Sequence, residues 1–252
     1  MTVALITGAN KGVGLAAARR LGQLGVKIWL GARSPEPGAI AAAALRAEGI
    51  DAEYVQIDVT RAASIQSAAN RIRAASGVLD VLINNAAVMS EVAGQAQTLK
   101  PSQVSGEILQ QIFSTNVLGP IAVIQAMLPL MRLSAAARIV NVSSRLGSFA
   151  HQTDPNWGPR AVNQLGYSSS KAALNMATVL FAYELRGTPV KINAVTPGIV
   201  ATDLNGVGAR HLEGRPGYAA PGDAVEWIVR CATLPEDGPS GGFFGLDGPL
   251  PW

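Results

Sequence analysis

A tyrosine and a lysine, Tyr167 and Lys171, stand four residues apart in the segment YSSSK. Residues at this spacing lie on one face of a helix, so the phenol and the ammonium would be neighbours. A nearby ammonium favours the phenolate and lowers the pKa of a tyrosine, which is about 10 without neighbours. Such a tyrosine can exchange protons near neutral pH as a general acid or base. The spacing alone also fits a solvated surface pair, so the interpretation depends on the rest of the chain.

A strand, a tight glycine turn and a helix are predicted at the start of the chain. The apolar run Val3–Thr7 indicates a buried strand, and the alanine-rich segment Leu15–Leu24 indicates a helix. Between them, Gly8 can take backbone angles closed to other residues, Gly12 lets the main chain approach a ligand, and Gly14 permits close helix packing. A pyrophosphate would meet free N–H groups at the helix N-terminus. The glycine spacing differs from the common dinucleotide fingerprint, so a merely structural turn stays open as an alternative.

Strands and helices alternate along the whole chain. Apolar runs bounded by turn residues predict six further strands, at Val26–Ala32, Glu53–Ile57, Leu79–Ile83, Arg138–Val142, Val190–Val195 and Gly242–Leu246. Helices are predicted between them, at Gly38–Glu48, Arg61–Ala75, Glu107–Leu133, Asn163–Arg186 and Pro221–Cys231. Pro120 and Pro129 should kink or interrupt the third of these helices. The order is typical of a doubly wound α/β (Rossmann) fold, a single domain over residues 1–252 with a seven-stranded, mainly parallel sheet covered on both faces.

Polar residues, glycines and prolines follow the predicted strands directly. Arg33, Asp58, Asn84–Ala87, Ser143–Ser144 and Pro197–Gly198 each come just after a strand. Because the carboxyl ends of parallel strands meet at one edge of a sheet, where such sheets bind ligands, these residues should line one crevice. The glycine-bearing, poorly periodic residues 200–220 are predicted to form a loop or lid with short helical pieces.

Composition excludes several classes of protein. The chain has 252 residues and a formal net charge of only +3, without a basic run, which argues against a nucleic-acid partner. One cysteine and two histidines allow no intrachain disulfide and give no zinc-ligand spacing, so no metal is expected. No stretch reaches 18 uninterrupted apolar residues and no targeting segment is recognisable, so we expect a cytoplasmic protein without a membrane partner.

Six motifs occur in an order and at positions that are known together from one family. They are TGANKGVG at Thr7–Gly14, NNAA at Asn84–Ala87, Asn116 in STNVLG, VNVSS at Val140–Ser144, Tyr167 with Lys171, and PGIVATD at Pro197–Asp203. The chain resembles the short-chain dehydrogenase/reductase family over essentially its whole length. Within that family it is most similar to NADPH-dependent carbonyl reductases, through Asn10-Lys11, Ala32-Arg33 and the ending Ser240–Trp252.

The resemblance implies a role for each of four catalytic residues. Tyr167 is the general acid that protonates the carbonyl oxygen, and Lys171 lowers its pKa and binds the nicotinamide ribose. Ser144 hydrogen-bonds the substrate oxygen, and it is preferred over Ser143 because the catalytic serine of the family is the second of this pair. Asn116 holds a water that relays protons to Lys171.

The resemblance also implies the residues that bind an NADP(H) cofactor. Asp58 and Val59 flank the adenine, Asn85 and Ala86 the adenine ribose, and the backbone of residues 197–200 holds the carboxamide with the Thr202 hydroxyl. The full set is Gly8, Asn10, Lys11, Gly12, Val13, Gly14, Arg33, Asp58, Val59, Asn85, Ala86, Ala87, Tyr167, Lys171, Pro197, Gly198, Val200 and Thr202.

The end of the second strand predicts the choice of cofactor. NAD is selected by an acidic residue at this position, whereas NADP requires its absence and a basic residue for the 2′-phosphate. The strand ends in Ala32-Arg33, with no carboxylate until Glu36. Arg33 offers a planar fork and Lys11 a second positive charge, so we expect NADPH. The alternative is that both are solvated surface cations.

Two departures from the family pattern affect the site. Ala87 occupies a position where the family usually has glycine, and the extra methyl could tighten the floor of the site. Ser144 and Tyr167 are separated by more residues than in many short members, which predicts an insertion at about residues 148–162. Within it, Trp157 either caps the pocket or packs the insertion onto the body, and His151 is expected to be a solvated loop residue.

The leading hypothesis is a reversible, NADPH-dependent reduction of a ketone or aldehyde to an alcohol. Two alternatives stay open: a lyase resembling halohydrin dehalogenases, and a non-catalytic, NADP-sensing regulator. The partners expected are a small-molecule carbonyl or alcohol substrate and further copies of the chain, as a dimer or tetramer formed through the two long helices. The insertion favours a monomer instead, because in some carbonyl reductases a longer insertion covers this surface.

Overall fold

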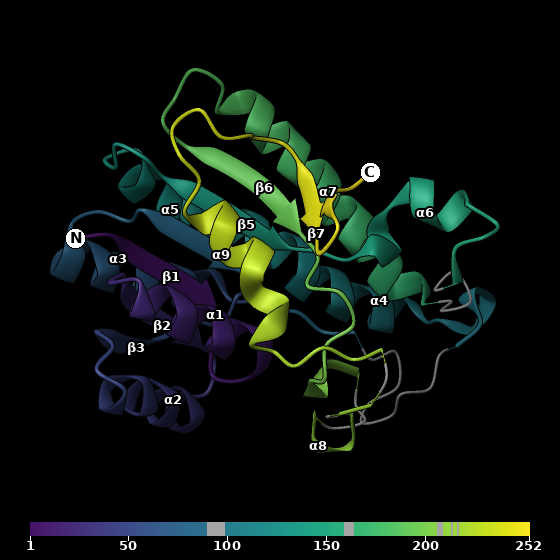
Figure 1. The fold of residues 1–252 in the computed structure, drawn as a ribbon, viewed down its shortest axis with the longest axis horizontal. Helices are drawn as coiled ribbons and strands as arrows, with labels where there is room; N and C mark the ends of the chain where they lie inside the picture. Colours follow the sequence, from purple (N-terminus) through teal and green to yellow (C-terminus); the bar gives the residue numbers. More distant parts are fainter. Residues whose placement is uncertain (90–98, 159–163, 206–208, 213, 216) are drawn as a thin grey trace.

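A twisted, mainly parallel sheet forms the centre of the protein (Figure 1). The computed structural model describes residues 1–89, 99–158, 164–205, 209–212, 214, 215 and 217–252. Parts of the predicted insertion and lid, and the predicted helix start at Asn163, lie outside the described residues.

The described sheet has eight strands, in the order β3-β2-β1-β4-β5-β6-β7-β8. They are β1 (Val3–Thr7), β2 (Lys27–Ala32), β3 (Ala52–Gln56), β4 (Val81–Asn84), β5 (Arg138–Val142), β6 (Lys191–Val195), β7 (Phe243–Gly245) and β8 (Gly248–Pro249). The prediction of seven strands was one short, because β8 has only two residues and pairs antiparallel with β7 across a tight turn. Chain order reverses between β1 and β4, and sheets of this kind bind ligands at the carboxyl ends of the strands at such a reversal.

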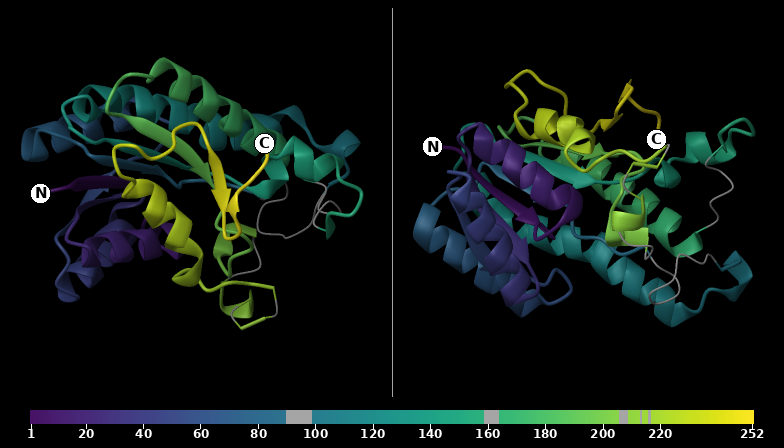
Figure 2. Two further views of the ribbon diagram at one scale, coloured as in Figure 1. Left: turned by 45° about the horizontal axis from the view of Figure 1, so that its top comes forward. Right: turned by 60° about the horizontal axis from the view of Figure 1, so that its bottom comes forward.

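Helices cover both faces of the sheet (Figures 1 and 2). They are α1 (Gly12–Gln23), α2 (Pro35–Ala47), α3 (Ala62–Ser76), α4 (Gly106–Phe113), α5 (Gly119–Met131), α6 (Phe149–Thr153), α7 (Leu165–Glu184), α8 (Ala209–Leu212) and α9 (Glu226–Ala232). Short 3₁₀ turns are η1 (Pro101–Gln103), η3 (Arg145–Gly147), η5 (Asp203–Asn205) and η6 (Asp223–Val225), and a π-helical turn, η2, spans Ser114–Leu118.

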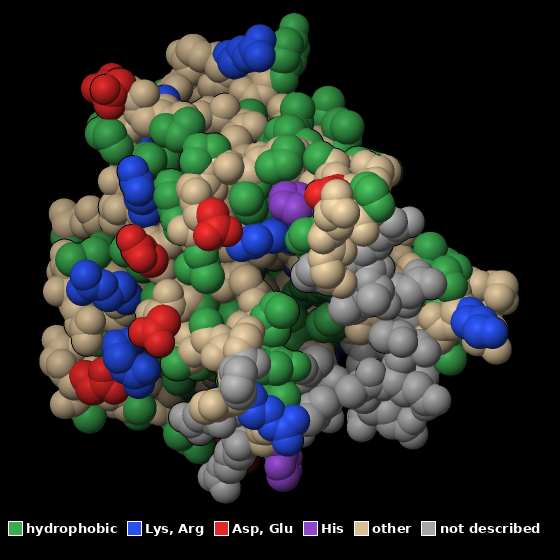
Figure 3. Space-filling model, turned by 45° about the vertical axis from the view of Figure 1, so that its right-hand side comes forward, with side chains coloured by type: hydrophobic (Ala, Val, Ile, Leu, Met, Phe, Trp, Pro, Cys, Tyr) green, Lys and Arg blue, Asp and Glu red, His purple; other side chains and the backbone are tan. Residues whose placement is uncertain are grey.

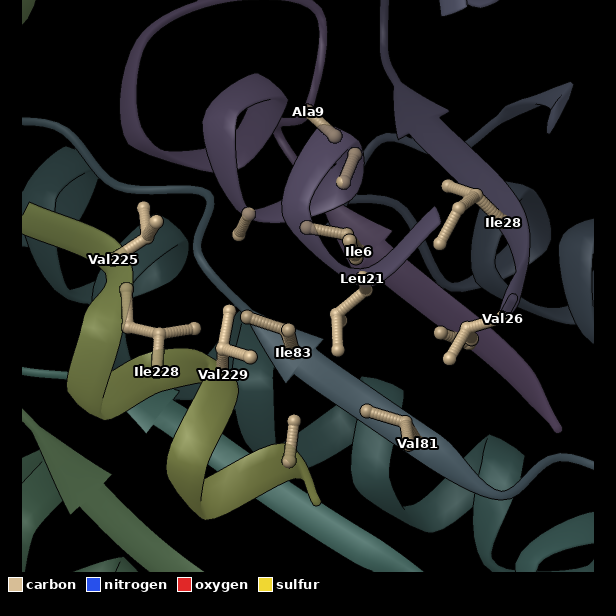
Figure 4. Close-up of a cluster of buried hydrophobic side chains, with 14 of the residues drawn as sticks. Ile6, Ala9, Leu21, Val26, Ile28, Val81, Ile83, Val225, Ile228 and Val229 are labelled. Atoms are coloured by element: carbon tan, nitrogen blue, oxygen red, sulfur yellow. The ribbon is translucent and has the colours of Figure 1, made fainter. Parts of the chain in front are cut away.

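The strands divide their side chains between two cores. In β1, Ala4 and Ile6 belong to a cluster with α1, α2 and α9, whereas Val3 and Leu5 belong to a second cluster with α3, α5 and α7. This is the two-residue alternation of a strand buried on both faces. Figure 4 shows the first cluster, in which Leu21 and Ile228 point toward Ile83.

The predicted helix Glu107–Leu133 is one helical stretch with a change of winding. It begins as α4, passes through the π turn η2, which contains Asn116, and continues as α5. Pro120 is the second residue of α5, directly after the π turn, and Pro129 lies inside α5. A π turn inserts an extra residue and re-aims the side chains around it.

The stretch Gly106–Met131 is also the one described helix that is long and apolar enough to cross a membrane, with 26 residues and a hydropathy of 1.4 over its most apolar window. Of that window, 44% is buried inside the protein. Val123, Ile124 and Met127 are fully buried in the second core cluster.

The insertion after Ser148 is fastened to the end of the chain. Ser148 Oγ donates to the carbonyl oxygen of Pro251 at 2.9 Å, and the N–H of Ala150 donates to that of Trp252 at 3.0 Å. Trp157 packs on His151 of α6, with ring centroids 5.1 Å apart. Because both residues belong to the insertion, this contact tests neither of the two roles predicted for Trp157.

Candidate functional site

Helix α7 places Tyr167 and Lys171 together beneath the carboxyl ends of the strands. Tyr167 is 6% exposed and Lys171 2%. The Lys171 Nζ lies 5.6 Å from the centroid of the Tyr167 ring and donates a hydrogen bond to the carbonyl oxygen of Val142 at 2.7 Å. The pair is therefore buried and internal, and the solvated surface pair is wrong. Figure 3 shows a hollow on one face of the molecule, with hydrophobic side chains inside it.

Ser144 meets the tyrosine from the end of β5. It is the N-cap of the turn η3, and its Oγ accepts a hydrogen bond from the N–H of Leu146 at 3.2 Å. Its hydroxyl also hydrogen-bonds the Tyr167 side chain, an interaction that lowers the pKa of the phenol. The predicted serine, tyrosine and lysine thus lie together, with Tyr167 and Lys171 buried and Ser144 half-buried.

Burial controls the charges of this cluster. It raises the pKa of Tyr167 to about 12, with the Ser144 hydroxyl opposing the rise, and it lowers the pKa of Lys171 to about 7. The expectation that Lys171 lowers the pKa of the tyrosine is therefore wrong for this arrangement. A lysine that is half deprotonated near neutral pH carries too little charge to offset desolvation of the phenolate. The phenol of Tyr167 is protonated at neutral pH.

Asn116 joins two elements through its side chain. It is fully buried in the π turn, and its Oδ1 accepts from the N–H of Val88 while its Nδ2 donates to the carbonyl oxygen of Val88, both at 2.8 Å. The Nδ2 also donates to Ser170 Oγ at 3.0 Å. Both N–H groups of the amide are thus used, so the water predicted at Asn116 would have to donate to its Oδ1 or bind its main chain. That water stays a prediction.

The glycine turn, residues 8–14, has the geometry of a phosphate cradle. Gly8 and Gly12 have positive φ angles, 64° and 57°. A Cβ on Gly14 would lie 2.5 Å from Asn85 Nδ2 and 2.7 Å from the carbonyl oxygen of Gly8. Helix α1 begins here with no acidic residue in its first turn and no side-chain cap from the described residues. Its N–H groups and positive dipole end are therefore available to an anion. Asn10 lies in this turn and Val13 in the first turn of α1.

Thr7, which the sequence analysis did not single out, connects the glycine turn to the end of β4. Its Oγ1 accepts from the N–H groups of Asn85 and Ala86 at 3.0 and 3.1 Å. The Asn85 Nδ2 donates to the carbonyl oxygens of Thr7 and Gly8 at 3.0 and 3.1 Å. Ala87 follows, half-buried. In the sequence, the available signal was a threonine between an apolar strand and the glycine turn.

The residues predicted at the adenosine end lie around the carboxyl ends of β2 and β3. Arg33 is exposed directly after β2, and its charge contributes to a lowered pKa of Asp58, after the larger effect of the Thr60 hydroxyl. Asp58 Oδ1 accepts from the Thr60 hydroxyl at 2.7 Å. Val59 is 8% exposed and packs closely on Gly119 at the start of α5.

Lys11 is engaged with the lid. Its Nζ lies 2.7 Å from Asp203 Oδ2, an ion pair that the sequence did not reveal. Beside it, Thr202 accepts from the N–H of Leu204 at 3.4 Å, and its Cγ2 would lie 3.3 Å from a Cβ on Gly12. The lid therefore lies directly against the glycine turn.

The other predicted lid residues follow β6. Pro197 is half-buried, Gly198 has a φ of 80°, and Val200 forms an isolated bridge with Ala219. The predicted cofactor residues thus surround one edge of the sheet, from β3 to the lid.

The residues present fit a dinucleotide phosphate. In the glycine turn, Cβ atoms added at Gly8 and Gly14 would collide with neighbouring atoms. Arg33 follows β2, at the position where recognition of a 2′-phosphate requires a cation. A nicotinamide cofactor bound here would supply hydride chemistry beside Tyr167. Within the described ranges, no group of three or more His, Cys, Asp or Glu side chains is arranged to hold a metal ion.

Known proteins match the chain over nearly its whole length. A family model described as short chain dehydrogenase matches residues 2–211. Short-chain dehydrogenase/reductase 1 of Saponaria officinalis is 32% identical over 294 aligned positions, covering 96% of this chain and 93% of the relative. A (+)-neomenthol dehydrogenase of Capsicum annuum is 29% identical over 306 positions, covering 96% and 94%.

Among solved structures, the NADPH-bound carbonyl reductase from chicken fatty liver superposes with a TM-score of 0.80 and 26% identity, covering 100% of both chains. The mainly parallel, doubly wound sheet agrees with these matches. The chain belongs to the short-chain dehydrogenase/reductase family of oxidoreductases.

Proposed function

We propose that the protein is an NADPH-dependent reductase of ketones or aldehydes, with Tyr167 as general acid. The observation that carries the proposal is the contact between the half-buried Ser144 hydroxyl and the buried Tyr167 phenol, with Lys171 on the same helix as Tyr167. The two hydroxyl groups can both address one substrate oxygen, which is what protonation of a carbonyl requires.

The residues divide the reaction between them. A bound NADPH would supply hydride to the carbonyl carbon, so the carbonyl oxygen must receive a proton. Tyr167 gives that proton from its phenol, and the Ser144 hydroxyl donates a hydrogen bond to the same oxygen. The Lys171 ammonium, whose pKa is lowered to about 7, can give up a proton at neutral pH and so return the Tyr167 phenolate to the phenol. In the reverse direction the same groups remove a proton from an alcohol.

The pKa of Tyr167 favours the reductive direction. A phenol with a pKa raised to about 12 is protonated at neutral pH and ready to donate. Oxidation of an alcohol needs the phenolate, which burial disfavours. Reduction should therefore be the faster direction near neutral pH, and oxidation should gain as the pH rises.

The choice of NADPH rests on the end of β2. Arg33 follows the strand with no carboxylate before Glu36, which lies in the first turn of α2. A planar guanidinium can bind phosphate oxygens in pairs. The chicken carbonyl reductase that shares the fold is NADPH-bound.

Turnover with a panel of carbonyl compounds tests the proposal. NADPH absorbance is followed with aromatic ketones, cyclic monoterpenoid ketones, quinones and sugars; the second class is included because the Capsicum relative is a neomenthol dehydrogenase. We expect at least one class to be reduced by the wild type and not by Tyr167→Phe. Binding of NADPH without turnover of any class would favour the sensing regulator, and carbonyl-independent halide release would favour the lyase.

A further inference from the structure

One buried carboxamide holds the segment that carries Ser144. Asn175 lies on α7, four residues after Lys171, and is 4% exposed. Its Oδ1 accepts a hydrogen bond from Ser143 Oγ at 2.5 Å, and its Nδ2 donates to the carbonyl oxygen of Gly147 at 3.2 Å. The two bonded residues stand on either side of Ser144.

The turn between these two points lies against the helix. A Cβ on Gly147 would lie 2.6 Å from the carbonyl carbon of Lys171 and 2.7 Å from its Cβ, so the backbones of the turn and of α7 are in contact. Just before the turn, the carbonyl oxygen of Val142 accepts a hydrogen bond from the Lys171 ammonium. The place of Ser144 against Tyr167 therefore depends on how the turn is attached to α7, and Asn175 supplies two of the attachments.

The carboxamide is the side chain that this place requires. It offers an acceptor to a hydroxyl and a donor to a carbonyl oxygen from one rigid group. Leucine has a similar volume and offers neither. Because the site is buried, no solvent replaces the lost bonds, and the turn must shift or leave its polar groups unpaired.

We propose that Asn175 is a positioning residue that sets the geometry of the Ser144–Tyr167 pair. The inference rests on the proposed function, since its consequence is catalytic. A displacement of Ser144 by about 1 Å would break the hydrogen bond to the phenol, and misplacements of this size can cost about a hundredfold in rate.

The test compares wild type, Asn175→Leu, Ser144→Ala and the double variant. Asn175→Leu should lower kcat by at least about tenfold with little change in the KM for NADPH. It should also move the apparent pKa of the kcat profile to higher pH, because the Ser144 hydrogen bond that lowers the pKa of Tyr167 is lost. In the Ser144→Ala background, the same substitution should change kcat by less than about threefold, since residues that act through one another are not additive.

Thr178→Val is the matched control. Thr178 is also fully buried on α7 and accepts from Asn141 Nδ2 at 2.9 Å, in a part of the helix without a bond to the turn. Thr178→Val should lower the melting temperature but should not shift the pH profile of kcat. If Asn175→Leu does not fold, Ser143→Ala removes the shorter bond with a smaller change and must give the same shift and the same non-additivity.

The outcomes separate this inference from the proposed function. A wild type that reduces no carbonyl compound removes both. An active wild type overturns the role of Asn175 alone if the folded Asn175 or Ser143 variant keeps its pH profile, or if it loses the same factor with and without Ser144.

Discussion

Lys11 and Asp203, 192 residues apart in the sequence, form an ion pair of 2.7 Å that joins the glycine turn to the lid. Both side chains are well exposed, so the pair is screened by solvent and contributes little stability. Its consequence is electrostatic: the Asp203 carboxylate offsets part of the positive charge that Lys11 would offer to a phosphate. Arg33 should therefore contribute more than Lys11 to recognition of a 2′-phosphate.

The first prediction concerns cofactor choice. We expect kcat/KM to favour NADPH over NADH by at least about tenfold, each factor of ten being about 1.4 kcal/mol. Arg33→Asp should erase or reverse this preference, Lys11→Met should weaken it less, and Asp203→Asn should strengthen it by releasing Lys11. The preference should decline as salt rises. Equal kcat/KM values for the two cofactors at low salt would show that Arg33 has been misinterpreted.

The second prediction is the loss of turnover in Tyr167→Phe. The substitution removes the hydroxyl that meets Ser144 and keeps the buried ring. General acid catalysis of this kind is worth roughly 10²–10⁴-fold, so kcat should fall by that factor while NADPH affinity, measured by fluorescence titration, stays close to wild type. A variant that keeps more than about a tenth of the wild-type kcat contradicts the role.

The third prediction is a pH-dependent cost of burying Lys171. Its pKa is lowered to about 7, so between that pH and the ordinary lysine pKa the unfolded chain binds one proton more than the folded protein. Wild-type stability should therefore rise with pH across this window.

Lys171→Met removes the titrating group and should be more stable than wild type at about pH 7, by a margin that narrows toward about pH 10. Urea unfolding of both proteins across this range measures the difference. A margin that is constant with pH would mean that the lysine stays charged when buried.

How far the sequence predicts the structure depends on the range of the interactions. The first and last residues of β1 and β5 were predicted correctly. A strand that is buried on both faces is a short, mainly apolar run, which the sequence shows directly. The winding change around Asn116 was not predicted. The prolines were the visible signal, whereas the π turn accompanies hydrogen bonds from Asn116 to Val88 and Ser170, which are distant in the sequence.

The site shows the same division. The motifs around Tyr167 and Ser144 predicted which residues come together, and the structure brings them together. The direction of the tyrosine pKa was predicted wrongly, because desolvation depends on packing that no motif records. Lys11 with Asp203, and Asn175 with Ser143, are pairs between distant segments of the chain, and nothing local indicates them.

The fourth prediction is self-association through α7. Met176, Leu180 and Tyr183 lie on one face of this helix and are 59%, 61% and 68% exposed. An exposed apolar stripe of this kind is typical of an interface. We expect light scattering to give a dimer or tetramer of the 26.0 kDa chain, and Leu180→Glu with Met176→Lys to give monomers that remain folded. A wild-type mass near that of one chain would refute the prediction.

The last prediction concerns the close approach at Gly14. A Cβ there would lie 2.5 Å from Asn85 Nδ2 and 2.7 Å from the backbone of Gly8, and neither group can retreat, because Asn85 is bonded to the carbonyl oxygens of Thr7 and Gly8. Gly14→Ala should therefore push α1 away from the glycine turn and cost about 1–3 kcal/mol of stability, with weaker NADPH binding because the N–H groups at the start of α1 move.

Gly106→Ala is the matched control for this substitution. Like Gly14, Gly106 lies in the first turn of a helix, its φ is not positive, and no described atom lies within 4 Å of an added Cβ. Alanine there should be neutral or stabilise by up to about 1 kcal/mol, because glycine loses more backbone entropy on folding. Thermal unfolding and NADPH titration of both variants decide the matter. If Gly14→Ala unfolds and binds like Gly106→Ala, the glycine turn does not need the close approach, and Asn85 is free to give way.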